Sequence, residues 1–353
     1  MRPPEEAGGA RRAARRGGSP SWCTGRLPPS CGAPGKKRAV AVYLAGLRKR
    51  LVLDSMLQNV VGAIAREGFA VHLYMTLVDN GNGENFRREK DAGHENPHLA
   101  NRSHESLASY LFDQVEAAGG CLVCMRFLNQ PEALPDIPEG YPWSRRMTQY
   151  PPGSSSVGRN VLRLWKSREE MWNVSLAHEK VLNQTYVFAM WTRDDAHWIR
   201  PIDTRWLATP QPARFVWSKG CREWGGINDK SVLFGRTAAA VMLTAYSTYF
   251  ASEPAYESYN SEAYLKNVAL SAHLVLKTLD FASLPSVDGM FTGGQGNESF
   301  CVFDFCDDWN QWELASAWNQ TLCSSSSLRA SFWRSIVALQ LFALLVRAPE
   351  HIV

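Results

Sequence analysis

The sequence lacks an apolar run long enough to cross a bilayer. Its C-terminal run, residues 336–346, is apolar except for Gln340, whereas a membrane-spanning helix needs about 20 residues. This length predicts a packed terminal helix, with a remnant of a membrane anchor as the alternative. Internal repeats and heptads are also missing, which excludes solenoid and coiled-coil architectures.

An excess of positive charge is missing from most of the chain. The formal net charge is +4, but residues 1–38 carry nine Lys and Arg against two Glu, which leaves −3 for the remaining 315 residues. This body lacks the basic surface of a nucleic-acid binder, so no nucleic-acid partner is predicted. The tail, residues 1–37, is rich in Gly, Pro, Ala and Arg and is predicted to be disordered.

Metal-binding patterns of the zinc type are absent. The eight His are scattered, and the single CxxC, Cys121 and Cys124, has no second CxxC beside it. A zinc site is therefore not expected, and disulfides or buried thiols are the alternatives. Three further cysteines surround an acidic, Trp-rich segment, and residues 286–353 are predicted to form a Cys- and Trp-rich C-terminal extension that ends in the apolar helix.

A secretory signal is not visible in the first 38 residues, which contain no apolar core. Yet the sequence contains five N-x-S/T sequons without Pro at the middle position: Asn101, Asn173, Asn183, Asn297 and Asn319. We therefore expect the lumen of the Golgi or another secretory compartment, with membrane anchoring through an N-terminal segment missing from this chain.

Apolar runs alternate with segments of helical spacing between residues 38 and 285. Strands are expected at 39–45, 68–75, 120–128, 186–191 and 215–218, and helices at 53–64, 106–116, 161–182, 237–249 and 261–276, with Ser261 as the N-cap of the last. Continuous apolar strands that alternate with helices are typical of buried parallel sheets. The pattern predicts an α/β domain with a mostly parallel sheet flanked by helices.

The strand at 186–191 leads directly into Arg193, Asp194 and Asp195. Adjacent carboxylates at the end of a buried strand repel each other and are hard to desolvate. A hard divalent cation with oxygen ligands relieves this repulsion and leaves positions open for a phosphate. The alternative is a pair of loop acids with Arg193 as their ion-pair partner.

Two further polar segments follow an equally regular pattern. Asp229 and Lys230 lie in an Asn-Asp-Lys turn that leads into an apolar strand, and Glu262 lies in the first turn of a helix. Each has a structural alternative, because acidic residues are common in turns and favourable near helix N-termini. A loop charge is likewise the alternative for Arg48, which follows Gly46 at the end of the first strand.

In order and spacing, residues 186–198 and 226–266 resemble a group of uncharacterised eukaryotic glycosyltransferase-like proteins with a GT-A-type (Rossmann-type) fold. The matching pattern is a strand that ends in Thr-Arg-x-Asp-x-x-Trp, then an Asn-Asp-Lys turn, then an Asn-Ser-Glu helix start. The resemblance covers roughly residues 38–276. It implies a Mn²⁺ or Mg²⁺ ion held by Asp195, with Asp194 as a further ligand, a ribose ligand or a solvent-facing group.

The resemblance also implies roles for the remaining candidates. Gly46 and Arg48 would contact the nucleotide, and Arg193 would hold the acidic loop or a phosphate. Asp229 and Lys230 would line the acceptor or donor side of the nucleotide-sugar site. Glu262 would be the general base or an acceptor-binding group, with Asp229 as the other candidate base. One departure is that the motif is Asp-Asp rather than a spaced Asp-x-Asp, which leaves metal dependence open.

The implied function is transfer of a hexosyl or related group from a nucleotide-sugar donor to a hydroxyl of a glycan or glycoprotein. Two alternatives remain. One is a catalytically inactive relative that binds glycans through its Trp residues, of which Trp191, Trp198, Trp217 and Trp224 are candidates. The other is a phosphodiesterase that uses Asp194 and Asp195, although no His-rich ligand set accompanies them.

Overall fold

The computed structural model describes residues 23, 38–79, 96, 99, 102–129, 131–292, 299–303, 306 and 321–322. Apart from Cys23, the predicted disordered tail lies outside these residues, as do most of the Trp-rich segment and the predicted terminal helix. No helix in the described part is long and apolar enough to cross a membrane.

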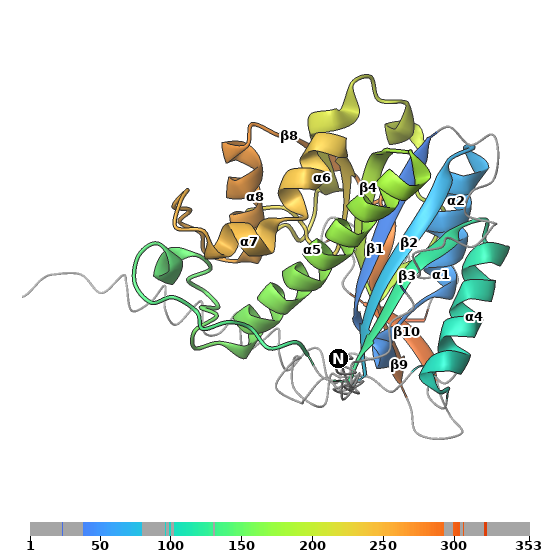
Figure 1. Cartoon of the computed structure of the whole chain (residues 1–353), viewed down its shortest axis with the longest axis horizontal. Helices are drawn as coiled ribbons and strands as arrows, with labels where there is room; N and C mark the ends of the chain where they lie inside the picture. Colours follow the sequence, from blue (N-terminus) through green and yellow to red (C-terminus); the bar gives the residue numbers. More distant parts are fainter. Residues whose placement is uncertain are drawn as a thin grey trace, which may run out of the picture.

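A seven-stranded sheet forms the centre of the molecule (Figure 1). Its strands lie in the order β3-β2-β1-β4-β7-β6-β8, and all are parallel except β7, which runs against both of its neighbours. The strands are β1 (Ala39–Leu47), β2 (Ala70–Val78), β3 (Cys121–Leu128), β4 (Tyr186–Arg193), β6 (Phe215–Lys219), β7 (Ser231–Gly235) and β8 (Val275–Leu279). The prediction of a mostly parallel sheet is confirmed, and the arrangement is compatible with a Rossmann-like fold.

Helices cover both faces of this sheet (Figure 1). One face carries α5 (Ser156–Leu182), α6 (Arg236–Met242), α7 (Ala245–Phe250) and α8 (Ser261–Ser271). The other carries α1 (Asp54–Met56), the π-helical turn η3 (Leu57–Val61), α2 (Gly62–Arg66) and α4 (His104–Ala117). Short 3₁₀ turns connect these elements: η2 (Arg48–Arg50), η6 (Trp143–Arg145), η7 (Arg205–Ala208) and η8 (Pro212–Arg214).

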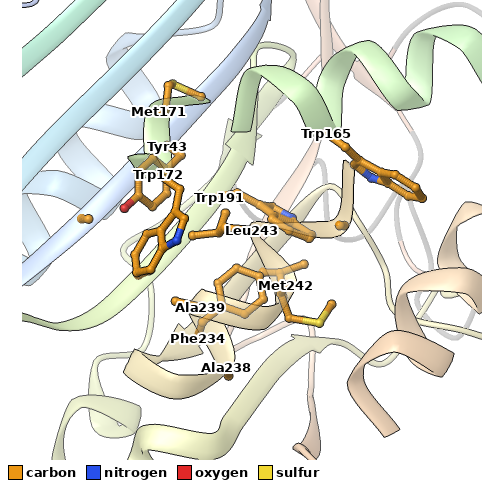
Figure 2. Close-up of a cluster of buried hydrophobic side chains, with 14 of the residues drawn as sticks. Tyr43, Trp165, Met171, Trp172, Trp191, Phe234, Ala238, Ala239, Met242 and Leu243 are labelled. Atoms are coloured by element: carbon orange, nitrogen blue, oxygen red, sulfur yellow. The ribbon is translucent and has the colours of Figure 1, made fainter. Parts of the chain in front are cut away.

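Strand β1 contributes side chains to two hydrophobic cores, one on each face of the sheet. Alternate residues of a strand point to opposite faces, so Tyr43 packs with the core under α5, whereas Val42 and Leu44 pack with the core under α2. Figure 2 shows part of the first core, where Tyr43 and Trp172 lie near Trp191 of β4. Burial of each large apolar side chain contributes roughly 1.5–3 kcal/mol.

Two helix predictions are wrong in detail. The helix expected at 237–249 breaks between α6 and α7, because the Thr244 hydroxyl donates to the carbonyl oxygens of Ala240 and Val241 at 2.9 and 3.0 Å and competes with the helical pattern. The helix expected at 261–276 ends at Ser271, since His273 adopts a left-handed conformation with φ of 53° and the chain turns into β8.

The N-cap of α8 also differs from the prediction. Asn260, not Ser261, is the cap, and its side-chain oxygen accepts from the Ala263 amide at 2.8 Å. Helix α5 likewise begins five residues before the predicted start, where the Ser155 side chain accepts from the amide of Gly158. Polar capping residues, rather than the spacing of apolar residues, determine where these two helices begin.

A second, three-stranded sheet joins the end of the chain to the domain. Strands β9 (Ser286–Thr292) and β10 (Ser299–Phe303) pair antiparallel, and β9 also pairs with β5 (Ala196–Trp198), which directly follows Asp195. Disulfides join Cys23 to Cys124 and Cys221 to Cys306. Cys121 and Cys301 are disulfide-bonded as well. The sequence left disulfides and buried thiols as alternatives, and the cysteines that the structure describes form disulfides.

Candidate functional site

The candidate site lies where β1 and β4 end and β7 begins. Because β1 and β4 are parallel and Ala45 lies opposite Arg193, their carboxyl ends meet at one edge of the sheet. Strand β7 is antiparallel to β4, so its first residues lie at the same edge. Open parallel sheets bind ligands outside the carboxyl ends of their strands.

Asp194 is held inside the protein rather than facing solvent. Its side chain accepts two hydrogen bonds from Arg50, both at 2.9 Å, and one from the Leu47 amide at 2.8 Å. A Cβ at Gly46 would lie 2.1 Å from its carboxyl carbon, so only glycine fits there. Burial raises the pKa of Asp194, against the attraction of Arg50.

Asp195 forms a second ion pair beside the first. Both of its oxygens accept from Arg193, at 2.9 and 2.6 Å, and Arg50 lies 3.2 Å away. Burial by itself would raise the pKa of Asp195, but these two guanidinium groups outweigh it and hold the pKa far below its usual range. Asp195 is therefore ionised and paired.

This arrangement does not fit a ready-made divalent metal site. The oxygens of Asp194 and Asp195 are occupied by guanidinium groups. Across the part of the chain that the structure describes, no group of three or more His, Cys, Asp or Glu is placed to hold a metal ion. The Mn²⁺ or Mg²⁺ ion implied by the resemblance stays a prediction, and no chemical step is derived through it.

Lys230 and Arg193 lie at the same cluster. The Lys230 ammonium is 2.8 Å from Asp288, a residue of β9. Burial alone would lower the pKa of Arg193, but Asp195 and Asp288 raise it well above its ordinary value. Asp229, next to Lys230, adds to that effect.

Glu262 lies close to Asp229 at the start of α8. The Ile227 amide donates to the Glu262 carbonyl at 3.1 Å, and the Ser261 hydroxyl donates to the Glu262 carboxylate at 2.8 Å. Burial, followed by the charge of Asp229, raises the pKa of Glu262 to about 7. A carboxylate with this pKa can take up or release a proton near neutral pH, as a general base must.

Arg168 of α5 is an unexpected member of the cluster. It is 1% exposed and lies 4.1 Å above the ring of Trp191. Its Nη2 donates to the Asp229 carbonyl at 3.2 Å, whereas Nε and Nη1 are buried without a hydrogen-bond partner among the described residues. Burial lowers the pKa of Arg168 to about 10, so the group stays charged at neutral pH.

Sequence reasoning missed three residues of this cluster: Arg50, Arg168 and Asp288. Arg168 had a signal, because it lies three residues from both Trp165 and Met171 and so falls on the buried face of its helix. Arg50 and Asp288 had none, since their partners are far away in the sequence.

The structure does not bring Arg48 to the cluster. Its guanidinium instead lies 3.3 Å from Asp79 and donates to the carbonyl oxygens of Leu99 and Arg102 at 2.8 and 2.6 Å. These partners follow β2, on the far side of β1 from β4. A structural role for Arg48 is therefore the simpler interpretation.

Charges in the cluster nearly balance. Four cationic side chains face five acidic ones, of which Glu262 is only partly ionised near neutral pH: Arg50, Arg168, Arg193 and Lys230 against Asp194, Asp195, Asp229, Asp288 and Glu262. An incoming diphosphate must therefore displace a carboxylate from its cation, use the free edge of Arg168, or bring its own counterion.

Comparison with known proteins gives little further guidance. No family model matches this sequence, and no curated protein matches it. Among solved structures, a nucleoside-diphosphate-sugar pyrophosphorylase from Vibrio cholerae RC9 is 11% identical with a TM-score of 0.33, over 70% of this chain and 94% of that one. The apo-form glycosyltransferase GlyE of Streptococcus pneumoniae TIGR4 is 10% identical with a TM-score of 0.32, over 68% and 45%. Likeness at this level carries no functional argument, so function has to be argued from the site.

Proposed function

We propose that this protein is a glycosyltransferase that moves a hexosyl or related group from a nucleotide-sugar to a hydroxyl of a glycan or glycoprotein. The observation that carries the proposal is the meeting of Arg168, Arg193 and Lys230 with Glu262 at the carboxyl edge of a parallel sheet. Cations can stabilise the charge of the leaving diphosphate, and a base with a pKa near 7 can accept the proton of the acceptor hydroxyl.

The donor diphosphate would bind to the cations. Nε and Nη1 of Arg168 offer two donors without a partner in the described residues, and a guanidinium edge matches phosphate geometry. Because both atoms are buried, the residues that cover Arg168 must move before a diphosphate can reach them. Arg193 and Lys230 belong to the same cluster and would stabilise the charge that develops on the leaving diphosphate. Gly46 would act indirectly, because its missing side chain makes room for the Asp194 carboxyl group beside the cations.

Glu262 would act on the acceptor, with burial and the charge of Asp229 holding its pKa up. As the acceptor oxygen bonds to the anomeric carbon, the bond between that carbon and the phosphate oxygen breaks. The acceptor proton passes to Glu262, and the nucleoside diphosphate leaves with the bonding electrons.

Metal use and location belong to the same proposal. A Mn²⁺ or Mg²⁺ ion at Asp195 and Asp194 requires their guanidinium partners to move, and such an ion would supply charge that the balanced cluster lacks. A secretory-pathway lumen is supported by the disulfides of the described cysteines, since such bonds persist in oxidising compartments. Membrane anchoring through a segment outside this chain remains part of this proposal.

A glycan-binding relative without turnover is the second candidate. It is favoured by one observation: guanidinium groups neutralise both Asp194 and Asp195. Such pairing stabilises a fold without requiring chemistry.

A thermal-shift screen followed by turnover assays tests the proposal. UDP, GDP and their sugars, with and without Mn²⁺, should raise the melting temperature, because a ligand that binds only the native state stabilises it. Turnover of a donor panel should then fall about 100-fold or more in Glu262→Gln, as expected for loss of a general base. Glu116→Gln, on the opposite face of the sheet, is the matched control.

Asp195→Asn separates the two candidates. In an active enzyme that holds a metal there, it removes metal-dependent nucleotide binding, whereas a glycan-binding protein keeps its glycan affinity. A protein that neither responds to any nucleotide nor turns over any donor is not a glycosyltransferase of this kind.

A further inference from the structure

A closed loop, residues 221–228, precedes the Asn-Asp-Lys turn. The Asn228 side chain donates to the Cys221 carbonyl at 2.7 Å and joins the two ends of the loop. Cys221 is also bonded to Cys306. The loop is therefore fixed at its base by a hydrogen bond and by a covalent bond.

The tip of this loop lies directly on the start of α8. The Asn260 side chain donates to the Trp224 carbonyl at 3.1 Å, and the Ile227 amide donates to the Glu262 carbonyl at 3.1 Å. A Cβ at Gly226 would lie 1.9 Å from the Glu262 carbonyl carbon, so this approach requires glycine. The loop backbone and the start of α8 therefore pack directly against each other.

Trp224 is exposed at the tip of the loop. It is 63% exposed, whereas Trp191, Trp198 and Trp217 are buried. Its φ of 46° lies in the left-handed region, which is strained for a large side chain. Residues held in a strained backbone conformation cluster at functional sites such as ligand clamps, and the strain at Trp224 therefore indicates a binding role.

A second exposed ring lies three residues before Glu262. Tyr259 is 62% exposed, and its carbonyl accepts from the Gln149 amide at 2.7 Å. Three residues span at most about 11 Å, so the Cα atoms of Tyr259 and Glu262 lie within that distance of each other. Beside it is a shallow hollow open to solvent, which is lined by Arg145, Thr148, Glu257, Ser258 and Tyr259.

We infer that Trp224 and Tyr259 form a stacking platform for a neutral oligosaccharide acceptor, whose reactive hydroxyl lies at Glu262 and whose next sugar unit enters the hollow. The apolar face of a sugar ring packs on aromatic rings, and its hydroxyls bind paired polar groups. Arg145 and Glu257 provide such a pair, at 2.6 Å from each other and more than half exposed. Because their charges cancel, the hollow suits a neutral sugar better than an acidic one.

This inference rests on the proposed function for the identity of the ligand as an acceptor, but binding is measurable without a donor. Neutral and sialylated oligosaccharides are titrated against the protein and followed by saturation-transfer NMR and tryptophan fluorescence. A neutral oligosaccharide should bind, and Trp224→Ala and Tyr259→Ala should each weaken it about tenfold or more. Trp224→Phe, which keeps a ring, should stay within about threefold of the wild type.

Val181→Ala is the matched control, because Val181 is 64% exposed on α5 and lies outside the loop and the hollow. Its affinity should equal that of the wild type, and unfolding midpoints of all variants should show that each remains folded. Wild-type affinity in both alanine variants, preference for the sialylated sugar, or no binding of any oligosaccharide would overturn the platform.

The nucleotide screen keeps the two proposals apart. Nucleotide binding without oligosaccharide binding would refute the stacking platform alone. Oligosaccharide binding that depends on Trp224, without any nucleotide response, would refute the transferase activity and leave the platform as a glycan-binding site.

Discussion

Replacement of Asp194 by Asn should destabilise the protein by about 3 kcal/mol, because the loss of an acceptor for buried Arg50 outweighs the relief of removing a buried carboxylate whose pKa burial raises. The side chain is 1% exposed and holds Arg50 and the Leu47 amide through three hydrogen bonds of 2.8–2.9 Å. An Asn side chain has the same shape but offers one acceptor oxygen instead of two. Arg50 therefore keeps its charge and loses at least one partner.

The size of the expected stability loss follows from the buried charge of Arg50, which remains after Asp194 is replaced. Loss of one partner of a buried ion pair costs about 3–5 kcal/mol, because the other charge stays buried without compensation. Arg50 retains Asp195 at 3.2 Å, which places the expected loss at the lower end. Removal of both partners should be less harmful than the sum of the two single changes, by about 2 kcal/mol.

Urea unfolding with the disulfides intact measures these losses. The set consists of Asp194→Asn, Arg50→Met and the double variant, with Asp203→Asn as the control. Asp203 pairs with Arg205, which is 87% exposed, so the control should lose about 1 kcal/mol or less. A loss below about 1 kcal/mol for Asp194→Asn, together with additive behaviour of the pair, would refute the reasoning.

Four further outcomes are expected. Burial and Asp229 raise the pKa of Glu262 from 4.5 to about 7, so protonated Glu262 stabilises the folded state. This contribution is complete below pH 4.5 and is lost as the pH rises to about 7. The wild-type melting temperature should therefore fall relative to that of Glu262→Gln between pH 4.5 and about 7. Arg168→Met should leave stability unchanged or raise it, since Nε and Nη1 are buried without partners, yet abolish the nucleotide-dependent thermal shift. In a secretory host, Asn183 should carry an N-glycan, because it lies in the sequon Asn183-Gln-Thr185 at the end of α5. Thr185→Ala should remove this glycan, as detected by intact mass, and leave Asn183 itself in place as the left-handed cap of α5. Gly226→Ala should cost about 1–3 kcal/mol in urea unfolding, since its Cβ would overlap the backbone of α8.

Most of the sheet could be predicted because its strands are buried on both faces. The run at 39–45 is apolar throughout, and the structure places β1 at Ala39–Leu47 between two cores. Helix boundaries were harder, because single polar groups decide them. The Thr244 hydroxyl and the left-handed His273 end helices whose apolar period continues.

The candidate site was predictable in part. The position of Asp195 after a buried strand and of Glu262 at a helix start can be read locally, and the structure brings both to the same cluster. Their partners could not be found in this way. Arg50 reaches Asp194 over 144 residues, and Asp288 comes from a strand of the second sheet, so only the folded chain shows that guanidinium groups hold the acidic pair.

One reversed strand has a consequence for how such a site changes during evolution. Since β7 starts at the edge where β1 and β4 finish, Lys230 belongs to a connection and not to a strand exit. The Lys230 carbonyl accepts from the Arg193 amide at 3.2 Å, so the backbone at this position is tied to β4. Side-chain changes at the exposed Trp224 can therefore alter ligand selectivity while every paired residue of the sheet keeps its partner.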